Sequence, residues 1–280
     1  AMAAMFASLS TVLWLVTTVY AIGYLEGSPH RSRFFGFFSL CVTSTMGVAL
    51  AGNLFTFFVC YELLTASTYP LVVHRGTEKA LKGGRTYLVY AMSGGVALLV
   101  GMVWLQAVAG PVDFREGGSL AQFASTHRSS LVAIFALLVA GLGVKAALVP
   151  LHGWLPQAMV APAPVSALLH AVAVVKAGAF GIVRVVYDVY GVHTAGALGV
   201  MDALLGVAAF TVVYGSARAV FQDDLKKRLA FSTISQVSYI VLGVAMVGPT
   251  STIGAIVHLV HQGIIKLTLF LCAGNQAEEH

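Results

Sequence analysis

Residues 141–178 read GLGVKAALVPLHGWLPQAMVAPAPVSALLHAVAVVKAG, an apolar stretch that is interrupted by prolines. Four of the eight prolines in the chain fall within it, at positions 150, 156, 162 and 164. Pro150 offers no N–H to the carbonyl of Ala146, and its ring crowds the preceding turn. We therefore predict a helix that breaks about one turn after Lys145, with Pro150 and Pro156 as the residues of the break.

Composition places this stretch in a membrane. Of 280 residues, 58% are hydrophobic and only 10% charged, against about 25% charged in soluble chains. The mean hydropathy of +0.87 exceeds what a soluble core of this size hides, so apolar surface must face lipid. The net charge of +5 is spread along the chain, which excludes a nucleic-acid binder.

Apolar stretches of spanning length are spaced along the whole chain, and alternation typical of strands is absent. We expect an all-α, polytopic transmembrane helix bundle of about nine spanning helices, with the broken segment near 150–164. The first stretch has no basic leader and is too long for a signal-peptide core. The expected spans are 4–25, 34–51, 53–73, 86–108, 130–150, 164–187, 195–217, 229–248 and 252–273.

The basic residues predict the orientation, because cytoplasmic loops carry an excess of Lys and Arg. Of 16 basic residues, three lie on one side: Arg115, Arg128 and Arg184. Ten lie on the other side: Arg31, Arg33, Arg75, Lys79, Lys82, Arg85, Arg218, Lys226, Lys227 and Arg228. We expect an integral protein of the cell (inner) membrane with its N-terminus outside and its C-terminus cytoplasmic. The three remaining lysines lie inside spans.

Ionisable groups within spans are the candidate functional residues, since one charge at the bilayer centre costs about 2.5–3.5 kcal/mol on insertion scales. The four well inside spans are Glu62, Lys145, Lys176 and Lys266. Asp202 lies nearer a helix start. A break beside Lys145 favours a transport site, because irregular backbone at membrane depth is tolerated only where protein or water lines it. The alternative is a connection that bends back over the bundle.

Glu62 has no basic residue within one helical turn, so its partner must come from another helix, and Lys145 is the candidate. Burial disfavours the charged form of a lysine, whereas a nearby carboxylate favours it. A small movement of Glu62 could therefore switch the protonation of Lys145. The alternative is a static buried ion pair. His170 and Lys176 are six positions apart, about 9 Å along a helix. They are candidates for one hydrated path, and a structurally satisfied buried histidine is the alternative for His170.

The last span carries a polar stripe. His258, Gln262 and Lys266 are spaced i, i+4, i+8 along one face, with His261 beside them. Such a stripe in an apolar helix is expected to face a cavity. We expect no metal here, because acidic ligands are lacking nearby. The three cysteines have no CxxC-like spacing, and no GxGxxG follows a strand, so we also expect no cofactor.

Three segments resemble antiporter-like membrane subunits of respiratory complex I, Mrp-type cation/proton antiporters and membrane-bound hydrogenases. The run 141–178 resembles their signature, with a lysine seven residues before the histidine of HxWLPxA. FFVCYELLTASTYPLV resembles the fifth helix of the family. DDLKKRLAFSTISQ and KLTLFLCAG resemble its tenth and eleventh helices.

The resemblance implies roles for the candidate residues. Lys145 matches the protonatable lysine of a broken seventh helix, and Glu62 matches the carboxylate that tunes its pKa. His170 and Lys176 match positions on the central hydrophilic axis. His258 and Lys266 match the eleventh helix. The family often has His where Gln262 stands, so a histidine relay at this point requires that His261 substitutes.

The resemblance also implies an organisation. Family members have about fourteen helices, with two inverted five-helix repeats that form two half-channels. We expect residues 1–33 to hold a first helix and loop, 34–187 to be a complete first repeat, and 188–280 to be an incomplete second repeat. Either the chain is truncated or another polypeptide supplies the missing helices.

The functional expectation is a proton-translocating subunit of a redox-driven complex, with other membrane subunits as partners and no redox active site of its own. Whether it belongs to an enzyme is left open by the sequence. The first alternative is a D-like subunit of an Mrp-type Na⁺/H⁺ antiporter. The second is a structural or inactive truncated membrane subunit.

Overall fold

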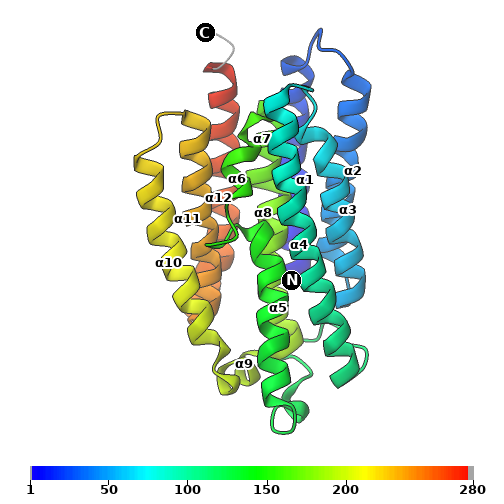
Figure 1. Cartoon of the computed structure of the whole chain (residues 1–280), viewed down its shortest axis with the longest axis vertical. Coiled ribbons are helices and arrows are strands. Elements are labelled where there is room, and N and C mark those ends of the chain that lie inside the picture. Colours follow the sequence, from blue (N-terminus) through cyan, green and yellow to red (C-terminus); the bar gives the residue numbers. More distant parts are fainter. Residues whose placement is uncertain (1, 277–280) are drawn as a thin grey trace.

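The computed structural model describes residues 2–276 of the chain. Within this range the regular structure is helical, with one isolated antiparallel bridge between Asn53 and Asp113. Nine helices in the described range are long and apolar enough to cross a membrane. The predicted all-α transmembrane bundle of nine spans is confirmed (Figure 1).

The long helices run roughly side by side (Figure 1). They are α1 (Met2–Tyr24), α2 (Arg31–Leu50), α3 (Leu54–Val72), α4 (Glu78–Ala109), α5 (Arg128–Ala146), α10 (Val200–Val220), α11 (Leu225–Ala245) and α12 (Pro249–Gln276). The short elements are η1 (Ala121–Phe123), α6 (Trp154–Gln157), η2 (Ala158–Val160) and α9 (Val192–Leu198). The sixth span, Ala163–Tyr190, is built from α7 (Ala163–Ala167), η3 (Leu168–Val172), α8 (Val174–Arg184) and η4 (Val185–Tyr190).

The break after the fifth span starts earlier than the prolines alone predict. Helix α5 ends at Ala146, and Ala147 adopts a left-handed conformation with a φ of 58°. Pro150 then lies in the turns that follow, and Pro156 lies inside α6. The left-handed residue stops the helix by turning the backbone, so the proline acts after the helix has already ended.

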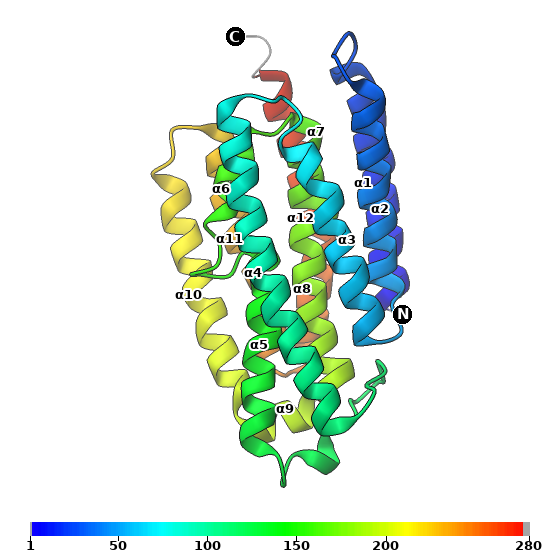
Figure 2. The same ribbon diagram turned by 45° about the vertical axis from the view of Figure 1, so that its right-hand side comes forward.

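The sixth span forms the centre of the bundle. Every residue from 163 to 183 is buried, and this segment contacts α5, α11 and α12 as well as α1 (Figure 2). The surrounding helices keep apolar side chains exposed on their outer faces, among them Val12, Val89 and Val213. A helix that is covered on all sides does not meet lipid, so polar side chains on it are enclosed by protein.

The start of α1 and the end of α12 lie toward opposite ends of the bundle (Figure 2). The connections α1–α2, α3–α4 and α10–α11 lie at the end where α12 finishes (Figure 1). The ten basic residues that the charge count assigned to one side lie in these connections or within two turns of them. We call this the basic end of the molecule.

Candidate functional site

Lys145 occupies the last turn of α5 and is 1% exposed. Its ammonium nitrogen donates a hydrogen bond to the main-chain carbonyl of Tyr61 in α3. It also lies 3.3 Å from the centroid of the Tyr61 ring. The C-terminal end of a helix attracts a cation, and the ring face adds a further favourable contact. The ammonium is therefore stabilised without an ion pair.

Helix α8 packs directly on the backbone at Lys145. A Cβ atom added to Gly178 would lie 2.3 Å from the amide nitrogen of Ala146 and 2.8 Å from the carbonyl carbon of Lys145. Only a glycine permits this approach. On the other side of the break, the Trp154 indole donates to the carbonyl of Val144 at 2.7 Å. Both contacts fix the end of α5 against the centre of the bundle.

Glu62 follows Tyr61 in α3 and is half-buried. Its carboxylate packs against Gly95 of α4, and its Oε1 atom is buried without a hydrogen-bond partner in the described structure. Ion pairs within 4.0 Å join Arg115 to Asp113 and Arg184 to Asp188. Glu62 and Lys145 are not joined in this way. The carboxylate is thus a neighbour of the lysine site, one residue along α3 from its acceptor.

His170 lies in a π-helical turn, η3, and is fully buried. Its ring stacks on Phe270 of α12 at 4.4 Å between centroids and 30° between planes. Neither ring nitrogen has a hydrogen-bond partner in the part of the chain that the structure describes. A wide π-helical turn inside a helix often marks a functional position. A buried imidazole without hydrogen-bond partners costs folding free energy, so its presence calls for an explanation.

Lys176 and Lys266 each donate hydrogen bonds to a neighbouring helix. Lys176 in α8 donates to the carbonyl of Leu259 in α12 at 2.8 Å. Lys266 in α12 donates to the Ser232 hydroxyl of α11 at 2.8 Å and to the carbonyl of Leu229 at 3.2 Å. Along α12, Lys266 lies between Leu259 and Phe270, the contacts of Lys176 and His170. Three buried basic side chains therefore gather where α8 and η3 meet α12.

The other predicted residues on α12 divide by face. Gln262 is buried, and its amide nitrogen and oxygen lack hydrogen-bond partners in the described residues. His258 is half-buried, 3.1 Å from the carbonyl of Gln236, and lines a surface groove between α11 and α12. His261 is exposed and points away from the buried stripe. Asp202 is likewise exposed near the start of α10, so neither joins the central group.

Sequence reasoning missed Tyr61, Ser232 as a contact of Lys266, and the role of Gly178. Their signals are weak, because tyrosine, serine and glycine are common in membrane helices. Thr211 was missed for the same reason, although its hydroxyl accepts a hydrogen bond from the amide of Val149 at 3.1 Å. These residues satisfy or cover the irregular backbone and the buried ammonium groups.

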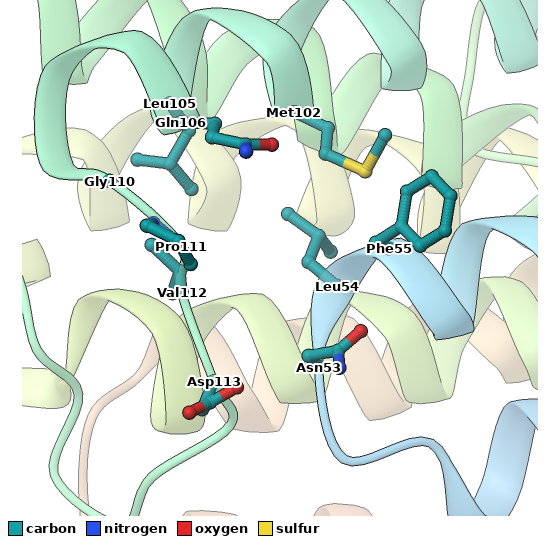
Figure 3. Close-up of a pocket in the computed structure, with 10 residues that line it drawn as sticks. All are labelled: Asn53, Leu54, Phe55, Met102, Leu105, Gln106, Gly110, Pro111, Val112 and Asp113. Atoms are coloured by element: carbon teal, nitrogen blue, oxygen red, sulfur yellow. The ribbon is translucent and has the colours of Figure 1, made fainter.

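The end opposite the basic end holds different features. Arg184 donates to Asp188 at 2.5 Å and to the carbonyl of Ala51 at 2.9 Å, which fastens the lower part of the central span. Figure 3 shows a pocket nearby, between the start of α3 and the end of α4, with Asn53 and Asp113 facing each other across its lower edge. None of the predicted site residues lines this pocket. Among residues 2–276, no group of three His, Cys, Asp or Glu side chains converges as metal ligands.

Comparison with known proteins gives a consistent picture. The family described as NADH:quinone oxidoreductase/Mrp antiporter, transmembrane, matches residues 51–280. The NADH-quinone oxidoreductase subunit N of Desulforudis audaxviator is 35% identical over 95% of this chain and 53% of its own length. A probable K⁺/H⁺ antiporter component of Rhizobium meliloti is 32% identical over 96% of this chain and 26% of its own length.

Solved structures agree with the sequence relatives. A chain of the Mrp complex from Dietzia sp. DQ12-45-1b superimposes with a TM-score of 0.82 at 26% identity, over 96% of this chain and 50% of that one. A chain of the archaeal membrane-bound sulfane sulfur reductase gives 0.84 at 26% identity, over 97% and 55%. The chain spans about half the length of these two structures and of its Desulforudis relative. From the family match and this bundle of apolar helices, the chain belongs to the NADH:quinone oxidoreductase/Mrp antiporter transmembrane family, as an antiporter-like integral membrane subunit.

Proposed function

We propose that the chain is a proton-translocating subunit in which Lys145 loads a proton from the cytoplasmic side and passes it along His170 and Lys176. The observation that carries this proposal is the burial of titratable groups along one central span. The backbone at Lys145 packs against Gly178 of α8. His170 and Lys176 lie on the same span as Gly178. Their side chains contact α12 on either side of Lys266.

The hydrogen bonding of this group supports a path. Among residues 2–276, His170 and Gln262 have buried polar atoms without hydrogen-bond partners, and so does Glu62 at its Oε1 atom. Groups that are buried and unpartnered are costly in a static core, whereas groups that exchange protons with a water-lined path gain their partners there. Glu62 lies close enough to the Lys145 site to bias its protonation by charge.

We assign residues 34–187 to one five-helix repeat that forms a half-channel, between the segment 1–33 and an incomplete repeat at 188–280. The cytoplasmic side is the basic end, which places the N-terminus outside and the C-terminus inside. The driving energy is supplied by redox subunits of a larger complex, in line with the names of the NADH-quinone oxidoreductase and sulfane sulfur reductase relatives.

Proton flux tests this function. The chain is reconstituted in vesicles with any membrane subunits that co-purify, a K⁺ diffusion potential is imposed, and an internal pH dye is followed. Lys145→Ala is expected to lower the flux by at least about tenfold, since a positioned acid–base group contributes on the order of 10²–10⁴-fold. Arg85→Ala removes an exposed basic residue outside the buried group and is the control. Unchanged flux in Lys145→Ala overturns the proposal and favours a structural or inactive subunit.

The second candidate is cation/proton antiport, which the likeness to an Mrp complex chain and to a K⁺/H⁺ antiporter component favours. The same vesicles separate the two candidates. If addition of Na⁺ or K⁺ drives proton movement when no potential is imposed, antiport replaces redox coupling. Co-purified iron–sulfur or flavin subunits support the redox-driven complex instead.

A further inference from the structure

The basic end of the molecule contains a pocket that lies apart from the buried lysines. It has a volume of about 520 Å³ and opens between the start of α4, the segment α6–η2 and the α10–α11 connection. Five basic residues line it: Arg75, Lys79, Lys82, Lys226 and Lys227. Among its described lining residues only Asp224 is acidic. We call this the basic pocket.

Two long helices begin at the basic pocket. The Thr77 hydroxyl caps α4 by accepting from the amide of Ala80 at 3.2 Å, and the Asp224 carboxylate caps α11 by accepting from the amide of Lys227 at 2.9 Å. The carboxylate of Asp224 is thus engaged at its own helix end. The start of a helix carries partial positive charge, so both helix starts add to the five basic side chains. The pocket favours an anion.

The surroundings of the basic pocket are apolar. At the α10–α11 connection, Val220 at the end of α10 is 74% exposed, Phe221 is 79% exposed, and Leu225 at the start of α11 is 42% exposed. These residues lie at the end of the span α10 and the start of the span α11, and the ends of spanning helices reach the boundary between acyl chains and headgroups. These apolar side chains make no favourable contact with a soluble anion, whereas a phospholipid presents a phosphate and acyl chains together.

The floor of the basic pocket belongs to the broken segment. Pro156, Gln157 and Val160 of α6 and η2 line it. The carbonyl of Gln157 would lie 2.7 Å from a Cβ placed on Gly83 of α4, so this floor is pressed against the start of α4. Trp154, at the start of α6, donates to the carbonyl next to Lys145. The pocket is therefore lined in part by the segment that follows the helix break.

We propose that the basic pocket binds the phosphate headgroup of an anionic phospholipid, with the acyl chains lying against Val220, Phe221 and Leu225. The bound headgroup bridges the starts of α4 and α11 over the α6–η2 segment. This inference concerns ligand binding, so it is tested separately from proton transport.

Native mass spectrometry of the full chain in mild detergent tests the site, with phosphatidylglycerol and phosphatidylcholine as probes. The wild-type chain is expected to retain phosphatidylglycerol in preference. Each basic side chain beside an anionic headgroup contributes roughly fivefold in affinity, so Lys79→Gln/Lys82→Gln/Lys227→Gln is expected to weaken retention on the order of 100-fold. The control Arg31→Gln/Arg33→Gln/Arg85→Gln removes the same charge from the same end, outside the pocket, and is expected to bind like wild type.

Four outcomes overturn the proposal. Equal retention of the two lipids by the wild-type chain removes the headgroup preference. Equal phosphatidylglycerol retention by the pocket variant removes the site. Equal loss in both triple variants assigns the effect to general surface charge. If millimolar inorganic phosphate raises the thermal unfolding midpoint as much as phosphatidylglycerol does, the ligand is a free phosphate and not a lipid.

Discussion

Lys145 and Lys266 are both buried ammonium groups, but the backbone that carries them differs. Lys145 ends a helix and rests on the Tyr61 ring and carbonyl, whereas Lys266 lies within the continuous helix α12 and is held by Ser232 and Leu229 of α11. A residue at a helix end moves without breaking main-chain hydrogen bonds on both sides of it. From this difference we expect Lys145 to be the lysine that exchanges protons, and Lys266 to hold a fixed position.

The largest expected difference is in proton flux. Lys145→Met is expected to lower flux on the order of 100-fold, and Lys266→Met by a smaller factor, in the vesicle assay. Neither variant is expected to lose stability, because removing a buried charge relieves a desolvation cost of up to about 3 kcal/mol. Equal losses of flux would contradict a special role for the helix end.

The glycines next to the two lysines give the next difference. Gly178→Ala places a Cβ against the backbone of α5, so we expect a loss of about 1–3 kcal/mol in unfolding free energy. Gly263→Ala meets Leu13 Cδ1 at 3.1 Å and the carbonyl of Ala171 at 3.3 Å, and the first of these is the end of a flexible side chain. We expect a loss below about 1 kcal/mol there. Unfolding midpoints in detergent measure both, and a larger effect at Gly263 would reverse the comparison.

Double-mutant cycles compare the contacts of each ammonium. We expect a coupling energy of about 2 kcal/mol between Lys145 and Tyr61, measured with Lys145→Met and Tyr61→Leu, because a desolvated cation lies over the ring. The coupling between Lys266 and Ser232 is expected to be about 1 kcal/mol, as for other hydrogen bonds inside membranes. Tyr61→Phe keeps the ring and serves as the control, since its coupling to Lys145 should vanish.

The smallest expected effect concerns His74, which lies outside both lysine sites. Partial burial, with the charges of Arg33, His30 and Arg75, lowers the pKa of His74 below its usual value of 6.5. The unfolded chain therefore binds a proton first as pH falls, and stability contributed by neutral His74 decreases from about pH 7 downward. His74→Gln is expected to flatten this slope in unfolding midpoints measured between about pH 5 and 8. An unchanged slope in His74→Gln would show that another group is responsible.

The fold could be predicted from the sequence because spanning helices need only length and apolar composition. All nine expected spans are present in the described residues. It also locates Lys145, His170 and Lys176, since an ionisable residue in an apolar run is conspicuous. It does not locate the end of α5, because Ala147 becomes left-handed for tertiary reasons that no local pattern reveals. The outward position of His261 depends on how α12 is rotated in the bundle, and a stripe of spacing alone does not fix that rotation.

The complete enclosure of the segment 163–183 has a consequence for biosynthesis. Helices α1 and α12 both pack against α7 and η3, so the first and the last described helices complete the cover of the centre. During insertion His170 and Lys176 leave the ribosome well before α12 does. Until α12 is inserted, we expect another protein, such as a chaperone or the insertion machinery, to cover these polar groups. The order of synthesis sets the length of that interval.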